Sequence, residues 1–175
     1  VASINPKLGY LFERGALFPW KTILDNVAVP LLFRGRNARE GRVRAREWIR
    51  RVGLAGFENY HPHQLSGGMR KRASLAMTMV YEPDIILMDE PFAALDVQTR
   101  NLMENELLDI WVQERKTVLF ITHDLEEAIV LSDRVIVMTA SPGRVKGSYG
   151  IPLGRRRCVT EVRFHPAFGP LYEAM

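Results

Sequence analysis

The segment DIILMDEP, residues 84–91, is a short apolar run that ends in two acids. Residues 84–88 are apolar enough to form a strand buried on both faces, and a loop, DEPFAALD, follows them. Two further runs of this kind, TVLFIT (117–122) and RVIVMT (134–139), each come after a helical stretch. Strands that alternate with helices of this length predict an α/β domain with a largely parallel sheet.

The N-terminal half of the chain is mostly helical in its pattern. LGYLF (8–12) predicts a short strand, and TILDNVAVPLLFRG (22–35) predicts a helix weakened by its proline. We expect the stretch 36–82 to form a helical sub-lobe against an α/β part, 83–150, within one domain. The sub-lobe's first helix carries an apolar stripe: Ala45, Trp48, Ile49 and Val52. The helix after the loop is expected to place four apolar residues on one side: Met103, Leu107, Ile110 and Trp111.

The composition is typical of a globular domain. The 175 residues are 47% hydrophobic and 25% charged, and no apolar run approaches the roughly 18 residues that a membrane span needs. The single cysteine, Cys158, rules out an internal disulfide framework and suits a reducing cytoplasm. The net charge of +4 is compatible with nucleic-acid binding. However, acids interrupt the arginines of residues 34–51, so a solvated helix face explains the charge as well, and we expect no nucleic-acid partner.

Polar residues follow two of the apolar runs at the point where each strand ends. In open parallel sheets, ligands bind beyond the carboxyl ends of the strands. Asp89 and Glu90 follow the first run, and His123 follows the second. We therefore expect two acids and a histidine to leave the same edge of the sheet, although they are far apart in sequence.

Each of these residues has a chemical role and a plain structural alternative. An aspartate after a short apolar strand is a usual Mg²⁺ ligand beside nucleotide phosphates, and the adjacent Glu90 can accept a hydrogen bond from an attacking water. Alternatively, Asp89 and Glu90 only begin a polar loop. His123 either contacts a γ-phosphate or is a buried, hydrogen-bonded structural histidine. Asp96 is in the first place a candidate N-cap for the helix after it.

A pair of glycines begins the helix in QLSGGMRKRASLAM, residues 64–77. Inside a helix each glycine costs about 1 kcal/mol relative to alanine. A helix start offers unpaired N–H groups and the positive end of the helix dipole, and Ser66 adds a hydroxyl. Gly67 and Gly68 would let a phosphate approach these amides. The alternative is a serine-capped helix in which the glycines are merely tolerated.

The order and spacing of these segments resemble the ATP-binding subunits of ABC transporters. The matching motifs are the signature LSGGMRKR (65–72), Walker B in IILMDEP (85–91), the D-loop in ALD (94–96) and the switch histidine in FITHD (120–124). The resemblance runs from about residue 9 to residue 145. GYLFERGALFPWKTILDNV (9–27) and VIVMTASPGRV (135–145) resemble more narrowly the nitrate, sulfonate and taurine importers.

The resemblance implies a P-loop-NTPase-like ABC ATPase domain that hydrolyses ATP with Mg²⁺ as a head-to-tail pair of ATP-binding subunits. It implies that Asp89 binds Mg²⁺ through water, that Glu90 polarises the attacking water, and that His123 contacts the γ-phosphate. The residues implied to act across the pair are Ser66, Gly67 and Gly68, which bind ATP in trans, and Asp96, which links the two sites.

The resemblance also implies partners at a membrane. Transmembrane permease subunits and, indirectly, an external solute-binding protein complete such an importer, with this subunit peripheral on the cytoplasmic face. The solute is chosen by those partners, so this sequence does not identify it. Two alternatives are a non-transport ABC ATPase and a non-catalytic subunit that lends its signature helix to a partner.

Two features depart from the family's pattern. Glu13 stands where the family has the Q-loop glutamine, and its carboxylate is a second candidate Mg²⁺ ligand. No G-x-x-x-x-G-K-[ST] phosphate loop occurs anywhere, and none of the lysines follows a glycine. In the family this loop and the first strands precede the Q-loop, so we expect them to lie before Val1. We predict that these 175 residues alone bind ATP poorly and do not hydrolyse it.

Overall fold

The structure, a computed structural model, describes residues 7–12, 16–93, 95–154 and 157–175. A parallel sheet has the strand order β1-β2-β3, formed by β1 (Leu8–Leu11), β2 (Ile85–Asp89) and β3 (Thr117–Ile121). The helices are α1 (Ile23–Phe33), α2 (Ala38–Arg51), α3 (Gly67–Met79), α4 (Val97–Glu114), α5 (Leu125–Leu131), α6 (Val159–Val162) and α7 (Phe168–Ala174), with a 3₁₀ turn at Pro62–Gln64. The predicted α/β class with a parallel sheet is confirmed.

The helical region α1–α3 forms as its sequence pattern predicts. Thr22 caps α1, and Asn37 caps α2 by accepting a hydrogen bond from the Arg39 amide at 2.8 Å. Gly53 follows α2 with a positive φ of 68°, a conformation that favours glycine after a helix. The predicted apolar stripe of α2 is buried along its length: Ala45, Trp48, Ile49 and Val52.

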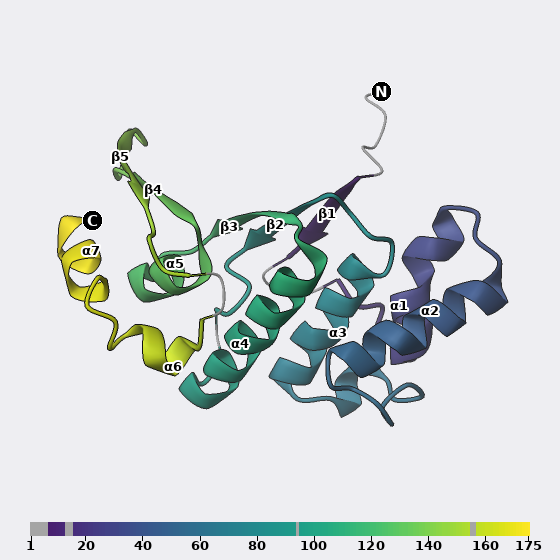
Figure 1. Ribbon diagram of the computed structural model, residues 1–175. Coiled ribbons are helices and arrows are strands. Elements are labelled where there is room, and N and C mark those ends of the chain that lie inside the picture. The colour runs from purple at the N-terminus through teal and green to yellow at the C-terminus, as the bar shows by residue number, and fades with distance from the viewer. Residues whose placement is uncertain (1–6, 13–15, 94, 155–156) are drawn as a thin grey trace.

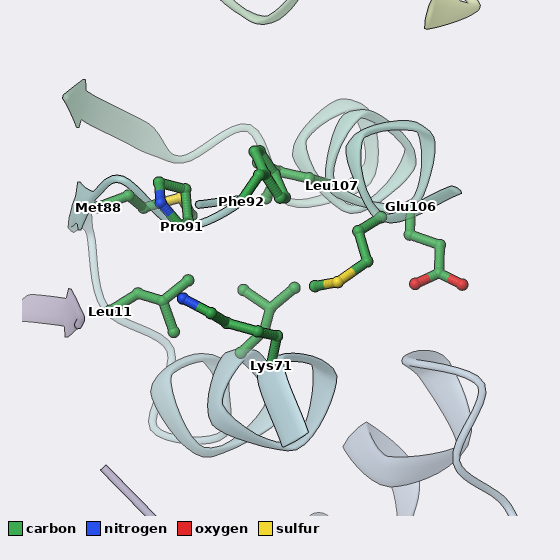
Figure 2. Close-up of a pocket in the computed structure, with 9 residues that line it drawn as sticks. Leu11, Lys71, Met88, Pro91, Phe92, Glu106 and Leu107 are labelled. Carbon is green, nitrogen blue, oxygen red and sulfur yellow. The ribbon is translucent and has the colours of Figure 1, made fainter. Parts of the chain in front are cut away.

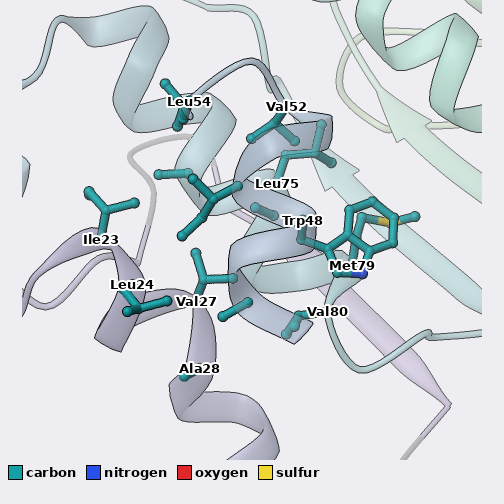
Figure 3. Close-up of a cluster of buried hydrophobic side chains, with 14 of the residues drawn as sticks. Ile23, Leu24, Val27, Ala28, Trp48, Val52, Leu54, Leu75, Met79 and Val80 are labelled. Carbon is teal, nitrogen blue, oxygen red and sulfur yellow. The ribbon is translucent and has the colours of Figure 1, made fainter. Parts of the chain in front are cut away.

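The main hydrophobic core lies where α1, α2 and α3 meet the sheet. Figure 3 shows side chains of the three helices converging there, among them Val27, Trp48 and Met79. Leu11, Ile86 and Met88 add the buried side of β1 and β2 to the same cluster. Full burial of each large aliphatic side chain contributes about 1.5–3 kcal/mol. One hydrophobic core includes residues of both the predicted sub-lobe, 36–82, and the predicted α/β part, 83–150. The boundary between these two parts stays a prediction.

The described residues bury one face of the parallel sheet and leave the other largely exposed. In Figure 1, α3 and α4 run side by side along the buried face. On it, Ile86 is 2% exposed, whereas Leu119 and Ile121, on the opposite face, are 57% and 55% exposed. The prediction that the runs at 84–88 and 117–122 are buried on both faces is therefore wrong for the described residues. Among the described residues this second face is largely open to solvent.

The run RVIVMT forms β4 (Arg134–Met138), but not in the parallel sheet. It pairs antiparallel with β5 (Val145–Gly150), and a turn joins them through a hydrogen bond from the Thr139 amide to the Arg144 carbonyl at 2.8 Å. The expectation that this run continues the alternation of the main sheet is thus corrected. An apolar run specifies a strand, but its partner is selected by packing.

Helix α4 lies between two hydrophobic clusters. Ile110 and Leu107 pack in the main core, whereas Leu108 and Trp111 pack with α5, α6 and α7 in a second one. The expectation that Trp111 shares one apolar side with Ile110 is therefore wrong, because the helix is covered on two sides. Within the described residues, no helix combines the length and apolar character that crossing a bilayer requires.

Candidate functional site

The carboxyl ends of β2 and β3 lie next to each other. Asp89 is in register with Ile121, and the next amide along, that of Glu90, donates a hydrogen bond to the Ile121 carbonyl at 2.9 Å. The segments that leave these strands therefore start side by side. The sequence prediction of a shared sheet edge is confirmed in its geometry.

Glu90 and His123 meet at this edge. His123 Nδ1 lies 3.1 Å from Glu90 Oε1. The His123 side chain is 77% exposed, so the alternative of a buried structural histidine is wrong. The hydrogen bond and the charge of Glu90 both raise the pKa of His123 above its ordinary value. With Nδ1 turned to the carboxylate, Nε2 is the ring nitrogen that can meet a ligand.

Glu90 has an unusual backbone for a non-glycine residue. Its φ is +41°, in the left-handed region, which costs on the order of 1–3 kcal/mol. The turn is held by hydrogen bonds at both sides, from the Glu90 amide to Ile121 and from the Ala93 amide to the Glu90 carbonyl at 3.2 Å. Because of this backbone, Glu90 does not continue the in-and-out alternation of the strand. Asp89 therefore ends β2, whereas Glu90 belongs to the turn that follows it.

Asp89 ends β2 as a half-buried carboxylate on the same side as Ile85 and Leu87, the uncovered side of the sheet. The described residues contain no group of three or more potential metal-ligating side chains. Mg²⁺ is usually held by one or two carboxylates together with waters and phosphates, so a single strand-end carboxylate fits such an ion beside a nucleotide. Glu13, the second predicted ligand, lies outside the described residues.

The start of α3 is open at the surface. Ser66 is its N-cap, and its Oγ accepts a hydrogen bond from the Met69 amide at 3.3 Å. Ser66 and Gly67 are exposed, and a Cβ added to Gly67 would meet no atom within 4 Å. The amide-rich helix end is thus accessible to an anion.

Gly68 has a different reason to be glycine. It is buried, and a Cβ added there would lie 2.5 Å from Thr99 Cγ2 on α4. The missing side chain lets α3 and α4 approach each other, so helix packing rather than ligand access explains this glycine. Sequence reasoning treated the two glycines alike because nothing local marks the contact with Thr99.

Asp96 is the N-cap of α4, which confirms the sequence prediction of an N-cap at this position. Its Oδ1 accepts a hydrogen bond from the Thr99 amide at 3.0 Å, and the hydrogen bonds with Thr99 lower the pKa of Asp96. The side chain is exposed. Its role in linking two subunits stays a prediction.

The site residues lie on an open surface rather than in a closed cavity. Figure 2 shows a small hollow behind the loop after Glu90, where Pro91 and Phe92 face Leu11 and Lys71. Its volume of about 10 Å³ is at the lower limit for one water, far too small for a nucleotide. A larger groove, about 430 Å³, runs along α2 and is not lined by any predicted site residue.

Sequence reasoning missed a charged cluster beside His123. Arg100 on α4 lies 3.3 Å from Asp124, and Glu127 accepts a hydrogen bond from Thr122 at 2.7 Å. Glu104, one turn after Arg100, is 2% exposed; burial, followed by the charge of Glu127, raises its pKa to about 7. The available sequence signal is a pair of oppositely charged residues, Arg100 and Glu104, four apart on a helix expected to have one apolar side.

The family comparison agrees with this arrangement. The family described as "ABC transporter" matches residues 1–93. The chain belongs to the ABC transporter family. The predicted family is therefore confirmed, although the prediction of a phosphate loop before Val1 is not tested by this match.

Curated relatives include ATP-binding proteins of importers. This ABC family chain is 44% identical over 169 residues to the taurine import ATP-binding protein TauB of Rhizobium johnstonii, covering 94% of the chain and 64% of the relative. It is 40% identical over 141 residues to the aliphatic sulfonates import ATP-binding protein SsuB of Bacillus cereus, covering 81% and 55%. An uncharacterised ABC transporter ATP-binding protein, MJ0412 of Methanocaldococcus jannaschii, is 51% identical over 156 residues, covering 89% and 58%. The chain thus spans 55–64% of these relatives' length.

Solved structures show the same fold. The ATP-binding cassette MJ0796, in a dimeric post-hydrolysis state bound to ADP and Pi, superimposes with a TM-score of 0.71 at 34% identity, covering 85% of this chain and 64% of that one. CbiO1 from Clostridium perfringens, part of the ABC transporter complex cbiONQ, gives a TM-score of 0.77 at 25% identity, covering 94% and 61%. The ABC ATPase fold is therefore confirmed.

Proposed function

We propose that this chain is part of the ATP-binding and ATP-hydrolysing subunit of an ABC importer for nitrate-, sulfonate- or taurine-like solutes. The observation that carries the proposal is the contact of Glu90 with His123 at the strand ends beside Asp89, in a chain of the ABC transporter family. The printed functions of the TauB and SsuB relatives support the importer class and the range of solutes.

The proposed chemistry is phosphoryl transfer to water. Bound Mg²⁺ and ATP supply the phosphoryl group and the neutralisation of its charge. Asp89, with Glu13 as the second candidate, would hold the metal through water, and Glu90 would accept a hydrogen bond from the attacking water. His123 would present Nε2 to the γ-phosphate while its Nδ1 stays on Glu90. Such catalysis depends mainly on positioning and charge.

The start of α3 is proposed to bind the nucleotide of a second subunit. Its exposed amides at Ser66 and Gly67 offer an anion site, and Gly68 lets the helix lie against α4. Asp96, exposed at the start of α4, would face the same partner. The dimeric state of the ADP-bound neighbour MJ0796 supports the pairing of two subunits.

The subunit is proposed to work at a membrane with other proteins. Permease subunits would bind it on the cytoplasmic face, and a solute-binding protein would act on the other side. The CbiO1 neighbour belongs to a multi-component ABC transporter complex, which supports this organisation.

The phosphate loop, which would form the cradle for the ATP phosphates, is proposed to come from polypeptide outside these 175 residues. None of their segments matches G-x-x-x-x-G-K-[ST], and the sheet presents an apolar face that the described residues leave uncovered. Reading the coding sequence upstream of Val1 is a direct test. A glycine-rich loop ending in Lys-Ser or Lys-Thr would place the cradle in the same gene.

An ATPase assay tests the function itself. We expect the 175-residue chain alone, with Mg²⁺ and ATP, to release no phosphate above background. A cradle-bearing complex, meaning this chain together with the polypeptide that supplies a phosphate loop to the site of Asp89 and Glu90, should hydrolyse ATP and lose that activity with Glu90→Gln. Hydrolysis by the chain alone, or an inert complex, would contradict the proposal.

A non-catalytic subunit is the second candidate, favoured by the missing phosphate loop and the open start of α3. Here the chain would only lend Ser66 and Gly67 to a partner's nucleotide. In the cradle-bearing complex, Glu90→Gln would then leave activity unchanged, whereas Gly67→Asp would abolish it by placing a negative charge where the phosphate binds.

A further inference from the structure

His123 lies in a short irregular segment between β3 and α5. Thr122, just before it, accepts a hydrogen bond from the Asp124 amide at 3.0 Å and donates one to Glu127 Oε2 at 2.7 Å. Asp124 Oδ1 in turn accepts from the amides of Glu126 and Glu127, at 2.9 and 3.3 Å. The residues on both sides of His123 are thus tied to the first turn of α5.

A single guanidinium connects this segment to the loop that carries Glu90. Arg100 Nη1 lies 3.3 Å from Asp124 Oδ2 and 3.7 Å from Glu127 Oε1. Its Nη2 donates to the Leu95 carbonyl at 3.5 Å, in the loop that begins at Glu90. Arg100 therefore contacts both segments that leave the sheet edge.

These contacts close a ring around the Glu90–His123 pair. At one end, the Glu90 amide binds the Ile121 carbonyl and joins the two segments where they leave the strands. At the other end, Arg100 joins Leu95 to Asp124. We propose that Thr122 and Arg100 are positioning residues that hold the imidazole of His123 against Glu90. The consequence for ATP hydrolysis rests on the proposed function, but the geometric claim does not.

The charges around His123 make its pKa a test of the two roles that Arg100 could have, as a charge and as a positioning group. Glu90, Asp124 and Glu127 all raise the pKa of His123, with Glu90 the strongest. Loss of the Arg100 charge alone would raise that pKa further, since a nearby cation disfavours the imidazolium. Loss of positioning would lower it, because the imidazole would leave Glu90. The sign of the change in Arg100→Met therefore distinguishes the two effects.

Thr122→Val is the cleanest variant, because it removes one hydroxyl and keeps both the shape and the charge. The pKa of His123 is measured by NMR titration of its ring signals in the full chain, assigned with a His123→Gln sample. We expect Thr122→Val and Arg100→Met to lower the pKa of His123 and Thr122→Ser to retain it. The control is Arg163→Met, which breaks an exposed ion pair between Arg163 and Glu126 of α5. It should leave the pKa of His123 unchanged.

Activity in the cradle-bearing complex provides the second readout. We expect Thr122→Val to lower kcat roughly 10- to 100-fold with little change in KM, since a misplacement of about 1 Å at a reacting group costs that much. An unchanged pKa of His123 in Thr122→Val, or a raised one in Arg100→Met, overturns the inference, and either variant decides if the other fails to fold. If the wild-type complex is inert, the proposed function fails, whereas the titration still decides the positioning role.

Discussion

The helical region α1–α3 and the edge of the sheet at β2 and β3 differ in how far their apolar side chains are buried. The helical region buries its apolar side chains within the described residues, as at Ile49, which is 0% exposed. At the sheet edge, Ile121 is 55% exposed, Glu90 has a left-handed backbone, and His123 faces solvent. The first region stabilises the chain, whereas the second leaves apolar and polar side chains open to solvent.

The largest expected effect is a loss of ATP hydrolysis, without a loss of stability, when Glu90 at the sheet edge is changed. Glu90→Gln in the cradle-bearing complex should lower the rate of ATP hydrolysis by about 100- to 10,000-fold, the usual contribution of a positioned general base. The free energy of unfolding should change little, because Glu90 is partly exposed. A phosphate-release assay and a urea titration measure the two quantities. Loss of folding in parallel with activity would erase the contrast between the regions.

A matched isoleucine pair gives the reverse result. Ile49→Ala should lower the free energy of unfolding by about 2–5 kcal/mol, because it leaves a cavity between packed helices. Ile121→Ala, on the uncovered face, should cost less than about 0.5 kcal/mol in the chain alone. Urea unfolding of both variants measures the difference. Equal losses would show that the sheet face is covered in solution.

The buried carboxyl of Glu104 should make stability depend on pH. Because its pKa is raised to about 7 from an ordinary 4.5, the favourable protonated form is fully present below pH 4.5 and is lost as the pH rises through 7. Glu104→Gln should therefore stabilise the chain at pH 8 by on the order of 1–3 kcal/mol and have little effect at pH 4. Thermal unfolding at both values tests this, and a destabilised variant at pH 8 would mean that the charge is needed by Arg100.

The two glycines of α3 give the smallest contrast. Gly68→Ala should destabilise the chain by about 1–3 kcal/mol, because its Cβ would overlap Thr99 Cγ2. Gly67→Ala has open space and should instead stabilise the helix by up to about 1 kcal/mol. Thermal unfolding distinguishes them. If Gly67→Ala also destabilised the chain, the start of α3 would be less open than the structure shows.

Local patterns predicted the elements and several of their ends. The stripe of α2, the caps at Ser66 and Asp96, and the exit of Glu90 and His123 from one edge all depend on spacing of a few residues and on the rule for parallel strands. The face on which Trp111 packs and the partner of β4 were not predictable in this way. Both depend on residues far away in the chain.

Sequence reasoning alone was enough to specify the family, the candidate residues and the strand ends that carry them, because motif order and short-range periodicity are written in consecutive residues. Only the folded chain decided that Gly68 serves the contact with Thr99, that the described residues leave one face of the sheet largely open, and that Arg100 joins the segments of Glu90 and His123. The physical reason is distance along the chain. Side-chain contacts between remote segments depend on how whole helices and strands pack, and no local pattern records that packing.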